Sequence, residues 1–129
     1  MIDKEKKSKI LIIEDSRELT EILKDRLVND GYDVFTAYDG EEGLQMAGTV
    51  QPDLLVLDLM IPKIDGYKLC EILKAKEEFK NMPVIMLTAR ASDVEQKIGY
   101  AMGADVYLVK PCEPTILLSN IKTLLEKKK

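Results

Sequence analysis

Short apolar stretches recur at regular intervals along this chain, and no other feature constrains its fold as strongly. Five stretches rich in Ile, Val and Leu occupy residues 10–13, 34–37, 54–57, 84–87 and 106–109. They are too short for typical helices and have the composition of buried parallel strands. The segments between them have helical periodicity, as Leu19, Leu23 and Leu27 illustrate by falling on one helical face. Strands and helices are therefore expected to alternate along the whole chain.

This alternation predicts an α/β fold. Right-handed crossovers place successive strands in one parallel sheet with helices on both faces. We expect a doubly wound five-stranded parallel sheet of the (βα)5 type. The 129 residues suit a single hydrophobic core. We therefore expect one domain over residues 1–129, with short basic tails at about residues 1–8 and 127–129.

Composition and charge exclude several classes of function. Hydrophobic residues make up 46% of the chain and charged residues 33%, which is typical of a globular protein. The net charge of −4 argues against direct binding of nucleic acid. No apolar run reaches the roughly 18 residues that span a bilayer, so we expect no membrane contact and a cytoplasmic location. Cys70 and Cys112 are too far apart for a Cys-x-x-Cys metal or redox pair.

Polar residues follow the apolar stretches at the points where ligands usually bind. In doubly wound sheets the ligand site lies at the carboxyl ends of the strands. The first stretch is followed by Glu14 and Asp15, and the third by Asp58. The fourth is followed by Thr88 and the fifth by Lys110. We therefore expect three acids, a hydroxyl and an ammonium group to meet at one edge of the sheet.

This set of side chains points to phosphoryl chemistry with a metal ion. Clustered carboxylates oppose one another's ionisation unless a cation lies among them. Mg²⁺, with Mn²⁺ as a substitute, suits such a site because it binds a few carboxylates, water and phosphate oxygens. Asp58 is the candidate nucleophile, since a carboxylate can attack phosphorus to form an acyl phosphate. Lys110 and Thr88 could each contact a phosphoryl oxygen.

Each of these residues also has a structural explanation when it is taken alone. Glu14 and Asp15 could cap the helix that follows them, which is a frequent role for acids at that place. Thr88 could be an ordinary β-branched strand residue, and Lys110 an ordinary surface charge. Asp58 has no evident capping role. The structural explanations together require several coincidences at one sheet edge.

Taken together, the motifs resemble the receiver domain of two-component response regulators. The matching segments are Glu14-Asp15, Asp58-Leu59-Met60-Ile61-Pro62-Lys63-Ile64-Asp65-Gly66, Thr88-Ala89, Gly103-Ala104-Asp105 and Lys110-Pro111. The resemblance covers nearly the whole chain and implies a flavodoxin-like receiver fold. It also implies a phosphorylation-controlled signalling switch that accepts its phosphoryl group from a histidine kinase or a histidine phosphotransfer protein. The chain has no histidine, so the phosphohistidine must belong to that partner.

The resemblance implies a catalytic and metal-binding role for individual positions. Asp58 matches the phosphoacceptor. Glu14 and Asp15, with Asp58 and the backbone carbonyl of Met60, match the ligands of the metal ion. Thr88 and Lys110 match the residues that contact the phosphoryl group.

The resemblance also implies how the signal is switched and ended. Thr88 and Tyr107 match the switch pair, in which the aromatic side chain turns inward on phosphorylation. The bond between Lys110 and Pro111 matches a peptide that is usually cis in the family. Two further positions, Met60 and Arg90, flank the approach of water to the phosphorus. Neither side chain can deprotonate a water molecule, so we expect slow dephosphorylation.

The expected signalling surface consists of the helix between Ser92 and Met102, the strand of Tyr107 and the last helix. Its partner is a downstream protein or a fused output domain, and a phosphorylation-dependent homodimer is an alternative. Val106 stands where the family often has an acid used in a dimer face, which leaves the geometry of that contact open. Lys63 and Cys112 also depart from the family pattern, replacing a glycine and an aromatic residue.

Two other classes of function compete with the signalling switch. A Mg²⁺-dependent phosphohydrolase with an aspartyl-phosphate intermediate would need an acid two residues after Asp58, where this chain has Met60. A receiver-like binding module without phosphorylation would not need the complete set of polar residues. A flavodoxin-like mononucleotide binder would need a glycine- or hydroxyl-rich loop after the first apolar stretch, and that loop is missing.

Overall fold

Residues 6–128 are described in the computed structural model of this chain. The expected basic tails fall at the limits of this range, and residues 1–5 and 129 lie outside it. The last helix runs over Pro114–Lys128, so the described residues 127 and 128 are helical.

Strands and helices alternate strictly along the described residues. The strands are β1 Lys9–Ile13, β2 Asp33–Ala37, β3 Leu54–Leu57, β4 Val84–Thr88 and β5 Val106–Val109. The helices are α1 Arg17–Asn29, α2 Gly40–Val50, α3 Gly66–Lys74, α4 Asp93–Met102 and α5 Pro114–Lys128. All five predicted strands are confirmed, and three of them extend by one residue, at Lys9, Asp33 and Thr88.

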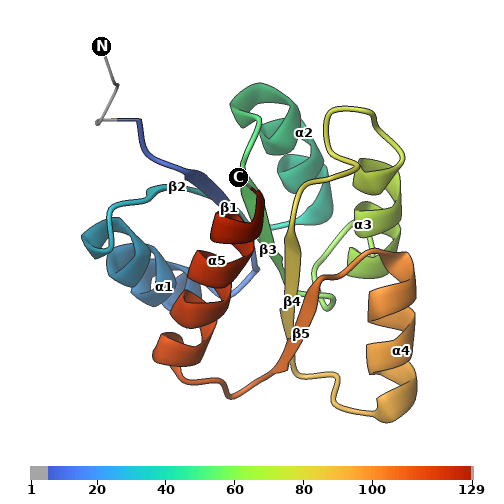
Figure 1. Ribbon diagram of the computed structural model, residues 1–129. Coiled ribbons are helices and arrows are strands. Elements are labelled where there is room, and N and C mark those ends of the chain that lie inside the picture. The colour runs from blue at the N-terminus through green and yellow to red at the C-terminus, as the bar shows by residue number, and fades with distance from the viewer. Residues whose placement is uncertain (1–5, 129) are drawn as a thin grey trace.

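The strands form one parallel sheet in the order β2-β1-β3-β4-β5. Helices α1 and α5 cover one face of the sheet, and α2, α3 and α4 cover the other (Figure 1). The chain changes direction across the sheet between β1 and β3, which are hydrogen-bonded neighbours. This strand order creates a switch point at the carboxyl ends of β1 and β3, where a doubly wound fold usually binds its ligand.

The core consists of two apolar layers that the sheet separates. Successive residues of β1 point to opposite faces, as expected for a strand. Leu11 and Ile13 pack in the layer beneath α2 and α3, whereas Ile10 and Ile12 pack against α1 and α5. All four side chains are completely buried. The central strands are therefore fixed on both faces, and they hold the residues at their ends in defined places.

Polar caps fix the helices that begin where the strands end. In each of four helices a side-chain oxygen just before the first turn accepts a hydrogen bond from a backbone N–H of that turn. The capping residues are Ser16, Asp39, Asp65 and Ser92. We call the side of the sheet where the strands end the carboxyl edge. The caps hold the helix starts against this edge.

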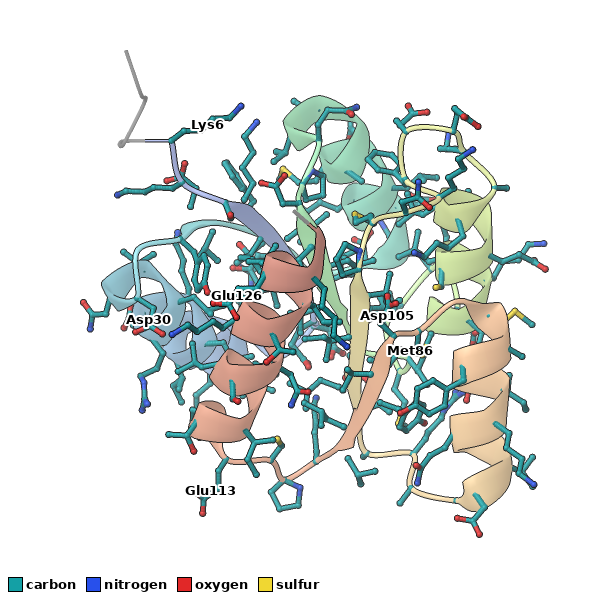
Figure 2. All side chains as sticks on the ribbon, in the orientation of Figure 1. Lys6, Asp30, Met86, Asp105, Glu113 and Glu126 are labelled. Atoms are coloured by element: carbon teal, nitrogen blue, oxygen red, sulfur yellow. The ribbon has the colours of Figure 1, made fainter. Side chains whose placement is uncertain are left out.

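The residues before and after β5 show where the carboxyl edge lies in the figures. Asp105, just before β5, accepts a hydrogen bond from the Val84 backbone N–H at 2.8 Å and so ties the beginnings of β4 and β5 together. Glu113 lies at the other end, beside the start of α5, and Figure 2 shows both residues. The carboxyl edge is therefore at the bottom of both views.

No helix among the residues described here is long and apolar enough to cross a membrane.

Candidate functional site

Three carboxylates meet at the carboxyl edge of β1 and β3. One oxygen each of Glu14, Asp15 and Asp58 lies within 4.8 Å of the other two. The neighbouring strands end in register, with Ile13 opposite Leu57, so the acids that follow them are brought together. Glu14 and Asp58 are buried, while Asp15 is exposed. The cluster is therefore shielded from solvent at Glu14 and Asp58 and accessible to solvent at Asp15.

Lys110 bridges the two buried carboxylates. Its Nζ lies 2.6 Å from Glu14 Oε1 and 2.9 Å from Asp58 Oδ2. The Lys110 backbone N–H donates to the Thr88 carbonyl at 2.8 Å, which continues the pairing of β5 with β4. The Lys110–Pro111 peptide bond is cis, as the resemblance implied. The ammonium group therefore enters the cluster from the end of a strand that is itself held in place.

Glu14 serves both the cluster and the adjoining helix. Its Oε2 accepts a hydrogen bond from the Ser16 backbone N–H at 3.0 Å, while its Oε1 faces Lys110. The N-cap of α1 is Ser16, whose hydroxyl accepts from the Leu19 backbone N–H. The structural explanation for Glu14 is therefore correct in part. Its second oxygen remains committed to the cluster.

The surroundings of Asp58 favour its ionised form. Burial alone would raise the pKa of this carboxyl, but hydrogen bonds from the Met60 backbone N–H and the Lys110 ammonium, with the Thr88 hydroxyl, outweigh burial and lower the pKa. The Met60 N–H lies 3.0 Å from Asp58 Oδ1. For Glu14 burial wins over the same ammonium group and raises its pKa. Asp58 is therefore the more readily ionised of the two carboxyls.

The donor set of the cluster suits a hard divalent cation. The three carboxylates offer only oxygen ligands, which Mg²⁺ prefers, and the exposed side at Asp15 leaves room for water in the coordination shell. Two carboxylates share one ammonium group in the present arrangement. A bound cation would supply the positive charge that this arrangement lacks.

Thr88 and Tyr107 both contact the backbone of Arg90, in the loop that leads from β4 to α4. Thr88 is completely buried at the end of β4, and its Oγ1 accepts from the Arg90 backbone N–H at 3.4 Å. Tyr107 is also buried and donates its hydroxyl hydrogen to the Arg90 carbonyl at 2.8 Å. The Tyr107 side chain is thus in the inward orientation in this structure. Its dependence on phosphorylation stays a prediction.

Met60 and Arg90, the two positions expected to flank the approach of water, are placed differently in the structure. The Met60 side chain is 53% exposed, beside the backbone N–H that contacts Asp58. The Arg90 guanidinium is paired with acids at the starts of two helices, at 3.6 Å from Glu95 Oε2 and 3.9 Å from Asp65 Oδ2. The sequence did not indicate that Asp65 or Glu95 contacts Arg90. No local pattern marks a contact between such distant segments.

Comparisons with known proteins agree with this geometry. The family model described as "Response regulator receiver domain" matches residues 10–122. The alkaline phosphatase synthesis transcriptional regulatory protein PhoP of Bacillus subtilis (strain 168) is 40% identical over 119 residues. The match covers 92% of this chain and 49% of PhoP. The ycf27 protein of Porphyridium aerugineum is 46% identical over 122 residues, covering 94% of this chain and 49% of that protein.

Solved structures are similar over almost their whole length. The receiver domain of the Francisella response regulator 1452 superposes with a TM-score of 0.89 at 32% identity, covering 95% of this chain and 99% of that chain. The chemotaxis response regulator CheY4 of Vibrio cholerae has a TM-score of 0.87 at 30% identity and covers 92% and 99%.

The extent of the matches defines what they establish. The chain spans about half the length of the curated relatives it matches. In this chain, the matched region carries the predicted doubly wound sheet, with the acidic cluster at its carboxyl edge. The chain therefore belongs to the receiver domain family of two-component response regulators.

Proposed function

We propose that Asp58 is the phosphoacceptor and that the chain itself catalyses the transfer. The observation that carries this proposal is the surroundings of the Asp58 carboxylate. This buried group has a lowered pKa, a lysine ammonium at 2.9 Å and two further carboxylates close by. An ionised carboxylate with a cation site beside it can attack phosphorus without a separate base.

The transfer is in-line displacement at phosphorus. An Asp58 oxygen forms a bond to phosphorus as the bond from phosphorus to the histidine nitrogen of the partner breaks, and the electron pair of that bond stays with the imidazole. Glu14, Asp15, Asp58 and the Met60 carbonyl would hold Mg²⁺. The ion would neutralise charge on the carboxylates and on the phosphoryl oxygens.

Lys110 and Thr88 complete the neutralisation of charge. The Lys110 ammonium forms ion pairs with Glu14 and Asp58 in this structure. A cation among the carboxylates would reduce the attraction of these acids for the ammonium group, which could then contact a phosphoryl oxygen. Thr88 supplies a hydroxyl donor from the end of β4. Both residues gain their new contacts only as the phosphoryl group arrives, which favours the transition state.

The phosphoryl group would control the surface formed by α4, β5 and α5. Thr88 and Tyr107 both contact Arg90, in the loop that leads into α4. A movement of Thr88 toward the phosphoryl group would therefore act on the start of this helix. We propose that the surface acts on an output domain, a downstream protein or a second receiver. PhoP is a transcriptional regulatory protein by name and extends well beyond the matched region, which supports the first of these partners.

Uptake of phosphate from a small donor tests the proposal. We expect acetyl phosphate with Mg²⁺ to add one phosphoryl group to the chain, and the intact mass measures this. Asp58→Asn should abolish the addition, while the exposed Asp25→Asn on α1 serves as the matched control and should retain it. Chelation of Mg²⁺ should also prevent it. An undiminished mass shift in Asp58→Asn would contradict the proposal.

A further inference from the structure

The guanidinium of Arg90 is held by groups outside the acidic cluster. Its Nη1 lies 3.6 Å from Glu95 Oε2, and its Nη2 lies 3.9 Å from Asp65 Oδ2. Its Cζ is 5.6 Å from the centre of the Tyr67 ring. We call Asp65, Tyr67, Arg90 and Glu95 the arginine cluster. The side chain of Arg90 is 31% exposed, so this arrangement is partly open to water.

Tyr67 fixes the position of Glu95 within the arginine cluster. The Tyr67 hydroxyl donates to the Glu95 carbonyl oxygen at 2.9 Å and also contacts the carboxylate of the same residue. The Glu95 backbone N–H is bonded to the Ser92 hydroxyl at 3.1 Å, which caps α4. Helices α3 and α4 are neighbours on one face of the sheet (Figure 1). The cluster therefore joins the first turns of two helices.

The backbone of Arg90 is close to the proposed chemistry, although its guanidinium is turned to the helices. The Arg90 N–H contacts the Thr88 hydroxyl, and that hydroxyl lowers the pKa of Asp58. A guanidinium freed from the helix acids could instead turn toward a phosphoryl group on Asp58, because the Arg90 backbone already contacts Thr88. One guanidinium cannot pair fully with the helix acids and cover the phosphoryl oxygens at once.

We propose that Glu95 and Tyr67 are positioning residues for Arg90, which hold its guanidinium away from Asp58 and thereby shorten the life of the phosphoryl group. This inference rests on the proposed phosphorylation of Asp58. Arg90 carries no base, so a guanidinium released onto the phosphoryl oxygens shields the phosphorus from water. Glu95 competes for the same guanidinium. The strength of that competition sets how long the site stays phosphorylated.

The phosphoryl lifetime in single and double variants tests this competition. Glu95→Gln removes the charge and should lengthen the lifetime by about twofold to fivefold, the range that a part-exposed ion pair supports. Tyr67→Phe should lengthen it less. In the Arg90→Ala background Glu95→Gln should have no effect. Glu78→Gln removes an exposed carboxylate elsewhere and is the matched control.

The results separate positioning from a general disturbance of the fold. An equal effect of Glu95→Gln with and without Arg90, no effect on the native chain, or a shortened lifetime would each overturn the proposal. Only a lengthening that requires Arg90 supports it.

A second measurement needs no phosphoryl group. The Nε–H signal of Arg90 in NMR spectra of the unphosphorylated chain should shift and exchange faster with water in Glu95→Gln, but not in Glu78→Gln. An unchanged signal in Glu95→Gln would contradict the positioning role. If the chain took up no phosphate at all, the proposed function would fail, and this spectrum would still decide whether Glu95 positions Arg90.

Discussion

At the scale of single residues, Lys110 holds two buried carboxylates at one place. Its Nζ is within hydrogen-bond distance of both Glu14 and Asp58, and burial of these acids would be costly without it. The arrangement is compatible with binding of a cation and a phosphoryl group. The Lys110 ammonium could then exchange a carboxylate oxygen for a phosphoryl oxygen. We therefore expect the stability of the chain and its proposed phosphoryl chemistry to depend on the same side chain.

The stability of Lys110→Ala should depend on Mg²⁺. Without the ion, Glu14 and Asp58 face each other with no ammonium, and we expect a loss of about 2 kcal/mol in the free energy of unfolding. Added Mg²⁺ should recover much of this loss, because a ligand that binds only the folded chain stabilises it. Urea unfolding with and without Mg²⁺ measures both effects.

An exposed lysine provides the control for this prediction. Lys68 forms a surface pair with Glu71 at 3.1 Å, and Lys68→Ala should change the free energy of unfolding by at most about 0.5 kcal/mol with either buffer. A Lys110→Ala variant as stable as Lys68→Ala in the absence of Mg²⁺ would contradict the charge balance described for the cluster.

We expect Met60 to set how easily water reaches the phosphorus of a phosphorylated Asp58. Its side chain is exposed beside Asp58 and has no group that can orient or deprotonate water. We expect slow loss of phosphate in the native chain and a loss about tenfold faster or more in Met60→Glu, where a carboxylate can accept a proton. Met60→Leu keeps an apolar cover and should behave like the native chain. A native lifetime of seconds that Met60→Glu left unchanged would refute this explanation.

At the scale of elements, α4 is the helix that the core holds least. Gly99 is its only buried residue, and Val94 and Tyr100 are at least half exposed. A Cβ built at Gly99 would lie 2.7 Å from the Tyr107 ring and 3.0 Å from Met86 Sδ. Figure 2 labels Met86 on β4, toward the α4 side of the sheet. The backbone of α4 thus packs directly against the Tyr107 ring at Gly99. This close contact couples the position of the helix to that of the ring.

Two glycine substitutions should therefore have opposite effects. Gly48 lies inside α2 with no atom within 4 Å of an added Cβ, so Gly48→Ala should raise the stability by up to about 1 kcal/mol through helix propensity. Gly99→Ala has the same propensity gain but must displace Tyr107 or the helix, and we expect a net loss of stability. Thermal unfolding compares the two variants. A similar stabilisation by both would show that α4 can shift away from Tyr107 at little cost.

At the scale of the whole molecule, the sequence predicted the sheet and the main site because both follow from one rule. Parallel strands end at the same edge, so Glu14, Asp58 and Lys110 could be brought together from the order of the apolar stretches alone. The strand bounds agreed to within one residue, and the apolar stretches were clearest for β1, β3 and β4, which are almost entirely buried. The contact of Lys110 with both acids is a consequence of this topology.

Features that depend on contacts between distant side chains could not be predicted. Tyr67 and Glu95 are far apart in sequence, and each has an ordinary helical surface pattern. The left-handed backbone of Lys63, with φ of 73°, is accompanied by ion pairs to Asp39 and Glu41 that no local pattern reveals. These features depend on how helices and loops pack, whereas the site depends on where strands end.

The assignment of Asp58 as the phosphoacceptor is tested most directly by identifying the residue that carries the phosphoryl group. After incubation with acetyl phosphate and Mg²⁺, borohydride reduces an aspartyl phosphate to homoserine, and peptide mass spectrometry then locates the modified position. We expect homoserine at position 58 and an unmodified Asp15. Homoserine at Asp15 or at any other acid, with Asp58 intact in a chain that had taken up phosphate, would contradict the assignment of Asp58 as the phosphoacceptor.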